Sequence, residues 1–172
     1  QLTKKKIIFN FRNNDILNGG EGAPLTPIFH QVIALQKKIN LPVCFLNIGG
    51  IANVTLVNKP IETSNLFSKD LGPGNCLIDN WVRKNSNDKF DRDGHLALIG
   101  KKNEIIFEQA RELYMNRKNK KKKSFDTNDF DISFIRGLNL EDGATTLTDF
   151  TASIISEELS LSLSNSKEKI QD

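Results

Sequence analysis

A short stretch near the start of the sequence combines one carboxylate, one guanidinium and three closely spaced glycines. Arg12 and Asp15 lie three residues apart, and Gly19, Gly20 and Gly22 follow them. A carboxylate within hydrogen-bond reach of a bound water can accept its proton, which is general-base catalysis. A guanidinium nearby can keep the carboxylate charged or contact substrate oxygens. Taken alone, the local sequence favours the simpler interpretation, an aspartate that closes a polar turn.

The segments on either side predict that this stretch is held between a strand and a helix. The apolar run 7–11 predicts a buried strand. Thr26 followed by Pro27 predicts a capped helix start. Residues on the helical period predict its buried face: Ile28, Phe29, Val32, Ile33, Gln36 and Ile39. His30 falls outside that face without a metal-ligand partner three or four residues on, which favours a surface histidine or one bonded to nearby backbone over catalysis.

A second group of candidates centres on a Gly-Gly pair between two apolar runs. Residues 43–48 and 51–57 predict two strands joined at Gly49 and Gly50, a strong hairpin signal. Glycines also let ligand oxygens reach backbone N–H groups, so the turn could cradle a phosphate, with Asn53 donating its amide. Local sequence alone favours a plain hairpin.

A third group follows the polar stretch 59–69, which predicts an irregular connection. Asp70, Gly72, Gly74 and Asn75 predict a loop that ends in a helix cap. The helix after it should bury Leu77, Ile78, Trp81 and Val82. A capped helix start can bind an anion, although most such loops only turn the chain. Asp70, interpreted as a surface aspartate, could position a magnesium ion through water.

The second half of the sequence adds structural signals and one basic run. Residues 90–94 open like a calcium loop but lack its later acidic ligands, which excludes an EF-hand. A helix is predicted over 105–114 with an apolar face of Ile105, Ile106, Ala110, Leu113 and Tyr114. Asn139 and Asp142 predict the capping box of a last helix. Its buried face should comprise Leu147, Phe150, Thr151, Ile154, Ile155 and Leu159. The basic run Arg117 to Lys123 contains no aromatic residue, so a solvated loop is favoured over a nucleic-acid or polyanion site.

Composition predicts one soluble globular domain with no charge-driven partner. Of 172 residues, 38% are apolar and 26% are charged, with a net charge of +3. Cys44 and Cys76 are far apart in the sequence, which favours reduced core thiols in a cytosolic protein over a single disulfide. No apolar run reaches the length of a membrane span, and no signal segment opens the chain. We expect a domain over residues 1–163 and a polar tail over 164–172.

Five motifs, in order, resemble those of the anhydro-N-acetylmuramic acid kinase family. They are FRxxD with GGxGAPL and PxFH (11–30), LNIGGIANVT (46–55), GPGNxLIDxW (72–81), FDxDG (90–94) and DxATxLTxxTA (142–152). The resemblance covers the chain from about residue 9 to residue 155. Each motif is moderately specific, and five in the right order are hard to obtain by chance.

The resemblance implies an α/β fold, mainly the second lobe of an actin-like and hexokinase-like (ribonuclease H-like) two-lobed kinase. It implies that ATP, with Mg²⁺, and water act on 1,6-anhydro-N-acetylmuramic acid to give N-acetylmuramic acid 6-phosphate. This reaction recycles cell-wall sugars in the bacterial cytoplasm, without nucleic-acid or membrane partners and compatibly with a homodimer of the full-length protein. Family members are longer and carry an amino-terminal phosphate hairpin and a carboxy-terminal adenosine segment. Neither appears here, so we expect a central fragment that is inactive alone.

The resemblance also assigns roles to residues. It makes Asp15 the general base and places residues 90–94 at a turn before a helix. Asp70 is expected to contact magnesium through a water molecule. Sugar contacts are expected from Arg12, Gly20 and Gly22, and phosphate or nucleotide contacts from Gly49, Gly50, Asn53, Gly72, Gly74 and Asn75.

The sequence departs from the family at two places, and two other functions remain open. Leu71 stands where the family has threonine, so a hydroxyl contact is lost there. After Lys123 and Ser124, residues 125–128 replace the family's Thr-Gly-Arg-Glu, so an arginine or glutamate function is not carried over. The alternatives are a sugar-binding fragment without turnover and a polyanion-binding protein that acts through residues 117–123.

Overall fold

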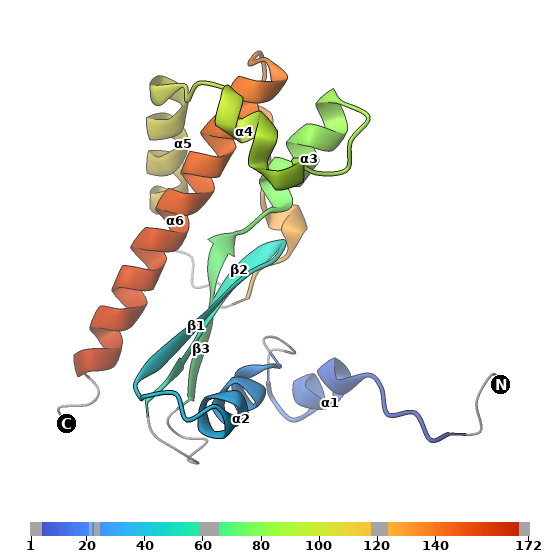
Figure 1. The fold of residues 1–172 in the computed structure, drawn as a ribbon, viewed down its shortest axis with the longest axis vertical. Coiled ribbons are helices and arrows are strands. Elements are labelled where there is room, and N and C mark those ends of the chain that lie inside the picture. Colours follow the sequence, from blue (N-terminus) through green and yellow to red (C-terminus); the bar gives the residue numbers. More distant parts are fainter. Residues whose placement is uncertain (1–4, 21, 23–24, 59–65, 118–123, 169–172) are drawn as a thin grey trace. The chain divides into compact units, whose positions relative to one another are not determined.

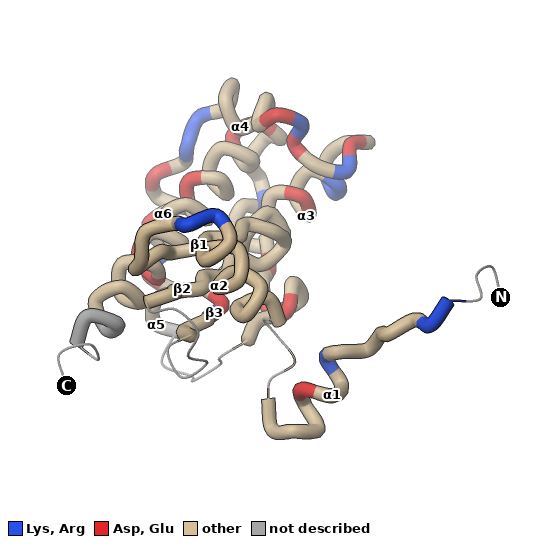
Figure 2. The backbone as a smooth tube through the Cα atoms, turned by 60° about the horizontal axis from the view of Figure 1, so that its bottom comes forward, with Lys and Arg blue, Asp and Glu red and all other residues tan. Residues whose placement is uncertain are grey.

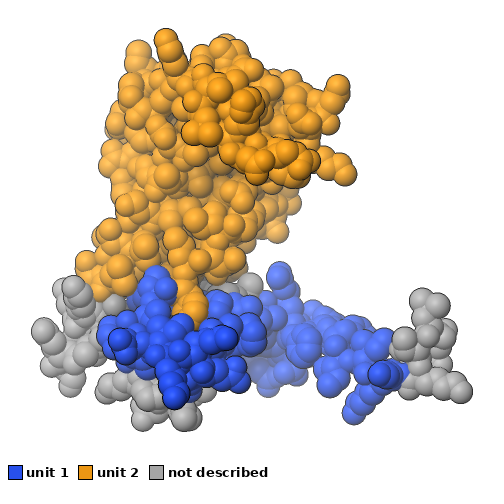
Figure 3. Space-filling model, viewed as in Figure 1, with its two compact units in different colours: residues 1–44, 55–68 blue, residues 45–54, 69–172 orange. Residues whose placement is uncertain are grey.

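The computed structural model describes residues 5–20, 22, 25–58, 66–117 and 124–168, although not the side chains of 117 and 165–168. The chain divides into two compact units, shown in blue and orange in Figure 3. Unit 1 comprises Gln1–Cys44 and Thr55–Ser68, and unit 2 comprises Phe45–Val54 and Lys69–Asp172. The mixture of helices and a small sheet confirms the predicted α/β class (Figure 1).

Three strands form one antiparallel sheet in the order β1-β2-β3. β1 (Val43–Ile48) and β2 (Ile51–Val57) have the predicted bounds and meet at the predicted Gly-Gly turn. β3 (Leu66–Pro73) corrects the sequence analysis, which expected irregular chain to residue 69 and a loop over 70–75. Pairing with β2 outweighs the loop signals, and the proline stands at the last position of an edge strand, where it is tolerated. Residues 59–65 lie outside the described part.

In unit 1, the predicted strand over residues 7–11 is wrong. Residues 7–10 have no regular structure, and α1 (Phe11–Leu17) begins where the strand was expected to end. A strand needs a neighbour for its backbone groups, and the described sheet contains only β1 to β3. Arg12 and Asp15 therefore lie on one turn of a helix and not in a polar turn.

The second helix of unit 1, α2 (Pro27–Gln36), starts where predicted but buries a different face. Thr26 occupies the N-cap position without a side-chain cap bond, so the predicted cap is wrong in that respect. Gln31 and Ala34 are the buried residues, whereas the predicted face is largely exposed, with Phe29 at 61%. His30 on α2 is bonded to Thr55 on β2.

Unit 2 is helical beyond the sheet. Its elements are α3 (Cys76–Asn85), η2 (Arg92–Gly94), α4 (His95–Ile99), α5 (Glu104–Arg117), η3 (Thr127–Asp129), η4 (Ser133–Ile135) and α6 (Leu140–Glu168). Helices α3, α4 and α5 all pack on α6, drawn in orange to red in Figure 1. The core consists of Leu77, Trp81, Phe107, Ala110, Ile132, Ile135, Ala144, Leu147, Phe150 and Ile154.

The predicted helical faces of unit 2 are confirmed for α3 and α6 and partly wrong for α5. Leu77, Trp81 and Val82 are buried, as are Leu147, Phe150, Thr151, Ile154 and Ile155. In α5, Phe107 and Ala110 face the core, whereas Ile105 and Leu113 are exposed. α6 continues beyond residue 163, and the domain boundary proposed there stays a prediction.

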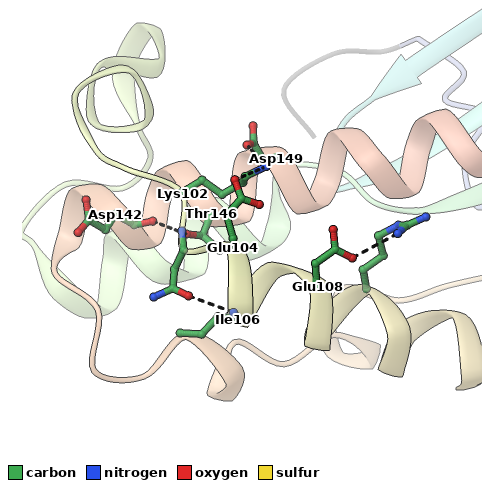
Figure 4. A network of polar contacts seen from close by, with 9 residues as sticks. Lys102, Glu104, Ile106, Glu108, Asp142, Thr146 and Asp149 are labelled. Carbon is green, nitrogen blue, oxygen red and sulfur yellow. Dashed lines mark hydrogen bonds and ion pairs between the residues drawn. The ribbon is translucent and has the colours of Figure 1, made fainter.

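Side chains bond the first N–H groups of α4, α5 and α6, whereas Asn75 at the N-cap position of α3 makes no side-chain cap bond. The N–H of Asp142 donates to Asn139 Oδ1 at 2.7 Å, which confirms the predicted cap of α6. Asp142 Oδ1 in turn accepts from the N–H of Lys101, and Thr146 Oγ1 accepts from the N–H of Asn103. Figure 4 shows the contact of Thr146 beside the ion pair of Lys102 with Asp149, where the chain before α5 meets the first turns of α6. The turn at 90–94 precedes a helix, as expected, and the Asp91 carboxylate accepts the N–H groups of two α4 residues.

The two cysteines and the basic run complete the comparison. Both thiols are free; Cys76 is half-buried, but Cys44 is exposed, so it is not the predicted core residue. Burial raises the pKa of both thiols. Arg117 ends α5, and residues 118–123 lie outside the described part. Figure 2 shows basic and acidic residues interspersed along the described backbone of unit 2.

Candidate functional site

The bend that follows α1 has a conformation that requires glycine. The N–H of Gly20 donates to the carbonyl of Asp15 at 2.8 Å, and the N–H of Gly19 donates to the carbonyl of Ile16 at 3.0 Å. These two bonds form a Schellman motif, in which the residue after the cap is left-handed. Gly19 has φ +86°, as the motif demands. The chain therefore reverses within a few residues of Asp15.

This reversal closes the chain around the Asp15 carboxylate. The N–H of Gly22 donates to Asp15 Oδ2 at 2.7 Å. A Cβ on Gly20 would lie 2.6 Å from Asp15 Oδ1, so only glycine leaves the carboxylate where it is. A Cβ on Gly22 would lie 2.5 Å from Arg12 Cγ. The structure thus brings together Arg12, Asp15, Gly20 and Gly22, while their roles stay predictions.

The second group of candidates meets at the turn between β1 and β2, in unit 2. The N–H groups of Gly74 and Asn75 donate to the carbonyls of Gly50 and Gly49 at 2.9 and 2.7 Å, and the N–H of Cys76 donates to that of Gly50 at 3.3 Å. Gly49, Gly50, Gly74 and Asn75 are therefore adjacent. The N–H groups of residues 74–76 are therefore used within the protein, so an anion at this turn must rely on other donors.

The other two phosphate candidates lie differently. Asn53 is half-exposed on β2. Gly72 is buried, and a Cβ there would lie 2.7 Å from Tyr114 Oη and 2.8 Å from Ile154 Cγ2, so close packing alone explains this glycine. The hydroxyl of Thr151 reaches the carbonyl of Gly74 at 3.5 Å, which connects α6 to the loop.

Asp70 is not the surface residue that the sequence suggested. It is 5% exposed, and its Oδ2 accepts the N–H of Phe125 at 2.9 Å and the hydroxyl of Ser124 at 3.3 Å. Within the described ranges, no group of three or more His, Cys, Asp or Glu side chains could hold a metal ion. No sequence signal pointed to these partners, which lie more than fifty residues away along the chain.

Two further polar connections were also missed. His30 is half-buried, and its Nδ1 lies 2.9 Å from Thr55 Oγ1, which lies 3.4 Å from Ser68 Oγ, a side-chain contact on β2 that the sequence did not predict. Burial lowers the pKa of His30. In unit 2, Lys69 Nζ pairs with the buried carboxylate of Glu158 at 2.8 Å. Only an apolar period or a cap is visible in sequence, and neither reveals such long-range bonds.

Asp15 belongs to unit 1, whereas the hairpin turn and Asp70 belong to unit 2. None of the helices in the described ranges has the length and apolar character needed to cross a membrane.

Comparison with known proteins identifies the family. The family model for anhydro-N-acetylmuramic acid kinase matches residues 1–170. Curated relatives with that name occur in Pelagibacter ubique (51% identity, 98% of this chain, 44% of the relative), Zymomonas mobilis (37%, 93%, 42%) and Methylobacterium nodulans (38%, 89%, 40%). The chain thus spans less than half the length of these relatives. It belongs to the anhydro-N-acetylmuramic acid kinase family.

Proposed function

We propose that this chain contributes the base and part of the phosphate site to a kinase acting on 1,6-anhydro-N-acetylmuramic acid. With ATP and water, the product is N-acetylmuramic acid 6-phosphate, in the recycling of cell-wall sugars in the bacterial cytoplasm. Family membership and the names of the relatives support this activity. The observation that carries the residue assignment is the Asp15 carboxylate, held by the N–H of Gly22 in a bend lined by glycine.

Asp15 would act on the water that opens the anhydro ring. As the water oxygen bonds to the anomeric carbon, the bridging bond to the 6-oxygen breaks and a water proton passes to the carboxylate. Such general-base assistance is typically worth about 10²–10⁴-fold. The bond from Gly22 to Oδ2 fixes the orientation of the carboxylate, and Arg12 on the same helix turn would contact sugar or phosphate oxygens.

The freed 6-oxygen would then attack the γ-phosphate of ATP, and the bond to ADP would break. We assign the Gly49–Gly50 turn and Asn53 to phosphate contact, because a glycine turn lets oxygens approach closely and because the N–H groups of residues 74–76 hold this turn in place. ATP enters as its magnesium complex. Asp70 does not fit a role as ligand, because it is buried and its Oδ2 is taken by two donors.

A chimera tests the proposal: residues 1–170 replace the matching segment of the Pelagibacter ubique relative, and formation of ADP and sugar phosphate is followed. Asp15→Asn keeps the shape and removes the base. It should lower kcat at least about a hundredfold, with KM for the sugar changed less than about threefold. Asn13→Ala, an exposed neighbour on α1, is the matched control. Near-normal turnover of Asp15→Asn would contradict the assignment, and an inactive unsubstituted chimera would contradict the function.

A further inference from the structure

We infer that Asp70 is a positioning residue, which holds residues 124–129 beside the β1–β2 turn, and is not a ligand of magnesium. The inference rests on the proposed function in one respect, namely that this turn contacts phosphate. It assigns a role to a carboxylate on β3, which is separated from β1 by β2.

The partners of Asp70 all come from one later segment. Its Oδ2 accepts the N–H of Phe125 at 2.9 Å and the hydroxyl of Ser124 at 3.3 Å. A buried carboxylate is costly unless it is hydrogen-bonded, and bonds to a charged group are stronger than neutral ones. At 5% exposure, Asp70 is therefore a strong attachment point for the segment that begins at Ser124.

The segment that Asp70 holds, residues 124–129, is also closed by hydrogen bonds of its own. In η3, Asp126 and Asp129 make a capping box, with the N–H of Asn128 donating to Asp126 at 2.9 Å and the N–H of Asp126 donating to Asp129 at 2.7 Å. The Phe125 ring packs on the Phe130 ring, with centroids 5.4 Å apart. Because Phe130 packs against the core of unit 2, this contact joins residues 124–129 to that core.

The segment 124–129 contacts the Gly49–Gly50 turn. A Cβ on Gly50 would lie 3.3 Å from the methyl group of Thr127, so the side chain of Thr127 covers that glycine. The turn thus has two supports, namely the N–H groups of residues 74–76 and the segment tied to Asp70. Releasing the Asp70 bonds would free the second support while leaving the first in place.

The pair Asp70→Asn and Asp70→Ala separates positioning from metal binding. Asparagine retains an oxygen that can accept both bonds but loses the negative charge that strengthens magnesium binding, whereas alanine loses both. Hydrogen exchange is measured on the chain itself. For the amides of residues 124–129, we expect exchange at least about tenfold faster in Asp70→Ala and within about threefold of the parent in Asp70→Asn. Asp88→Ala, in an exposed loop, is the control.

Activity is measured in the chimera as a function of ATP and magnesium. Asp70→Ala should lower kcat/KM for ATP at least about tenfold, and Asp70→Asn should restore it to within about threefold, with the magnesium requirement unchanged. Equal losses in both variants with a raised magnesium requirement would overturn the inference, as would unchanged exchange in Asp70→Ala.

The inference can still be tested if Asp70→Ala does not fold or if the unsubstituted chimera is inactive. If Asp70→Ala does not fold, the Asp70→Asn variant decides through its magnesium requirement: an unchanged requirement supports positioning and a raised one overturns it. If the unsubstituted chimera is inactive, the proposed function fails, and the exchange experiment alone decides whether Asp70 holds residues 124–129.

Discussion

Replacing Gly20 by alanine tests whether turnover depends on the position of the Asp15 carboxylate. A Cβ on Gly20 would lie 2.6 Å from Asp15 Oδ1, whereas ordinary contact begins at 3.4 Å. The carboxylate must therefore move by at least about 0.8 Å, the difference between these two distances, because Oδ2 would lie closer still to the added Cβ. The backbone itself accepts alanine, since Gly20 is not among the residues with positive φ.

The size of this displacement sets the expected effect. It breaks or lengthens the 2.7 Å bond from the N–H of Gly22, and a misplacement of about 1 Å can cost about a hundredfold in rate. We expect kcat of the chimera to fall about a hundredfold, which corresponds to about 2.7 kcal/mol of activation free energy. Substrate KM should change far less, because the sugar contacts that we propose for Arg12 remain.

Gly19→Ala is the matched control for this measurement. Gly19 has φ +86° with no atom within 4 Å of a built Cβ, so alanine strains the backbone by about 1–2 kcal/mol without touching the carboxylate. Steady-state kinetics should show kcat within about threefold of the parent. Unchanged kcat in Gly20→Ala would refute the reasoning, and equal losses at both positions would show that the shape of the bend matters and not the carboxylate.

Two further predictions concern unit 2 and unit 1. A Cβ on Gly143 would lie 2.5 Å from Trp81 Cζ2, and overpacking of about 1–3 kcal/mol should exceed the helix-propensity gain of about 1 kcal/mol. Gly143→Ala should therefore destabilise the chain to urea, but stabilise a Trp81→Leu parent, and the same sign in both would contradict this. Because burial lowers the pKa of His30, the unfolded state binds more protons below about pH 6.5. Stability should be retained above that pH and fall below it, and His30→Gln should lessen this acid loss; identical pH profiles from thermal unfolding would contradict the cause.

Local signals explain what the sequence predicted correctly. The bounds of β1 and β2 follow from two apolar runs separated by Gly-Gly, and the start of α6 follows from Asn139 and Asp142 three residues apart. The buried face of α3 is visible in the spacing of Leu77 and Trp81. In each case, the residues that determine the structure lie close together in the sequence.

Long-range pairing explains what the sequence could not predict. β3 contains glycine and proline, which are typical of loops, yet it pairs along β2. Residues 7–11 have the composition of a strand but no neighbour in the described sheet. α2 buries Gln31 and not Phe29, and His30 is bonded to Thr55, 25 residues later, a contact that the period of α2 does not reveal.

The candidate site divides in the same way. Arg12, Asp15, Gly20 and Gly22 are close in sequence, and the structure brings them together. The contact of Asp70 with Phe125 joins residues 55 positions apart, with nothing in either neighbourhood to announce it. Only the fold of unit 2 reveals that this aspartate is an attachment point.

The packing of three earlier helices on α6 has a consequence for synthesis of the chain. Leu77, Trp81 and Phe107 emerge from the ribosome before Leu147, Phe150 and Ile154, against which the core closes. At about 5–20 residues per second, these apolar side chains wait several seconds for their partners. We expect nascent chains that stop before residue 140 to bind chaperones or aggregate, and unit 2 to become protease-resistant only after the first four turns of α6 have been made.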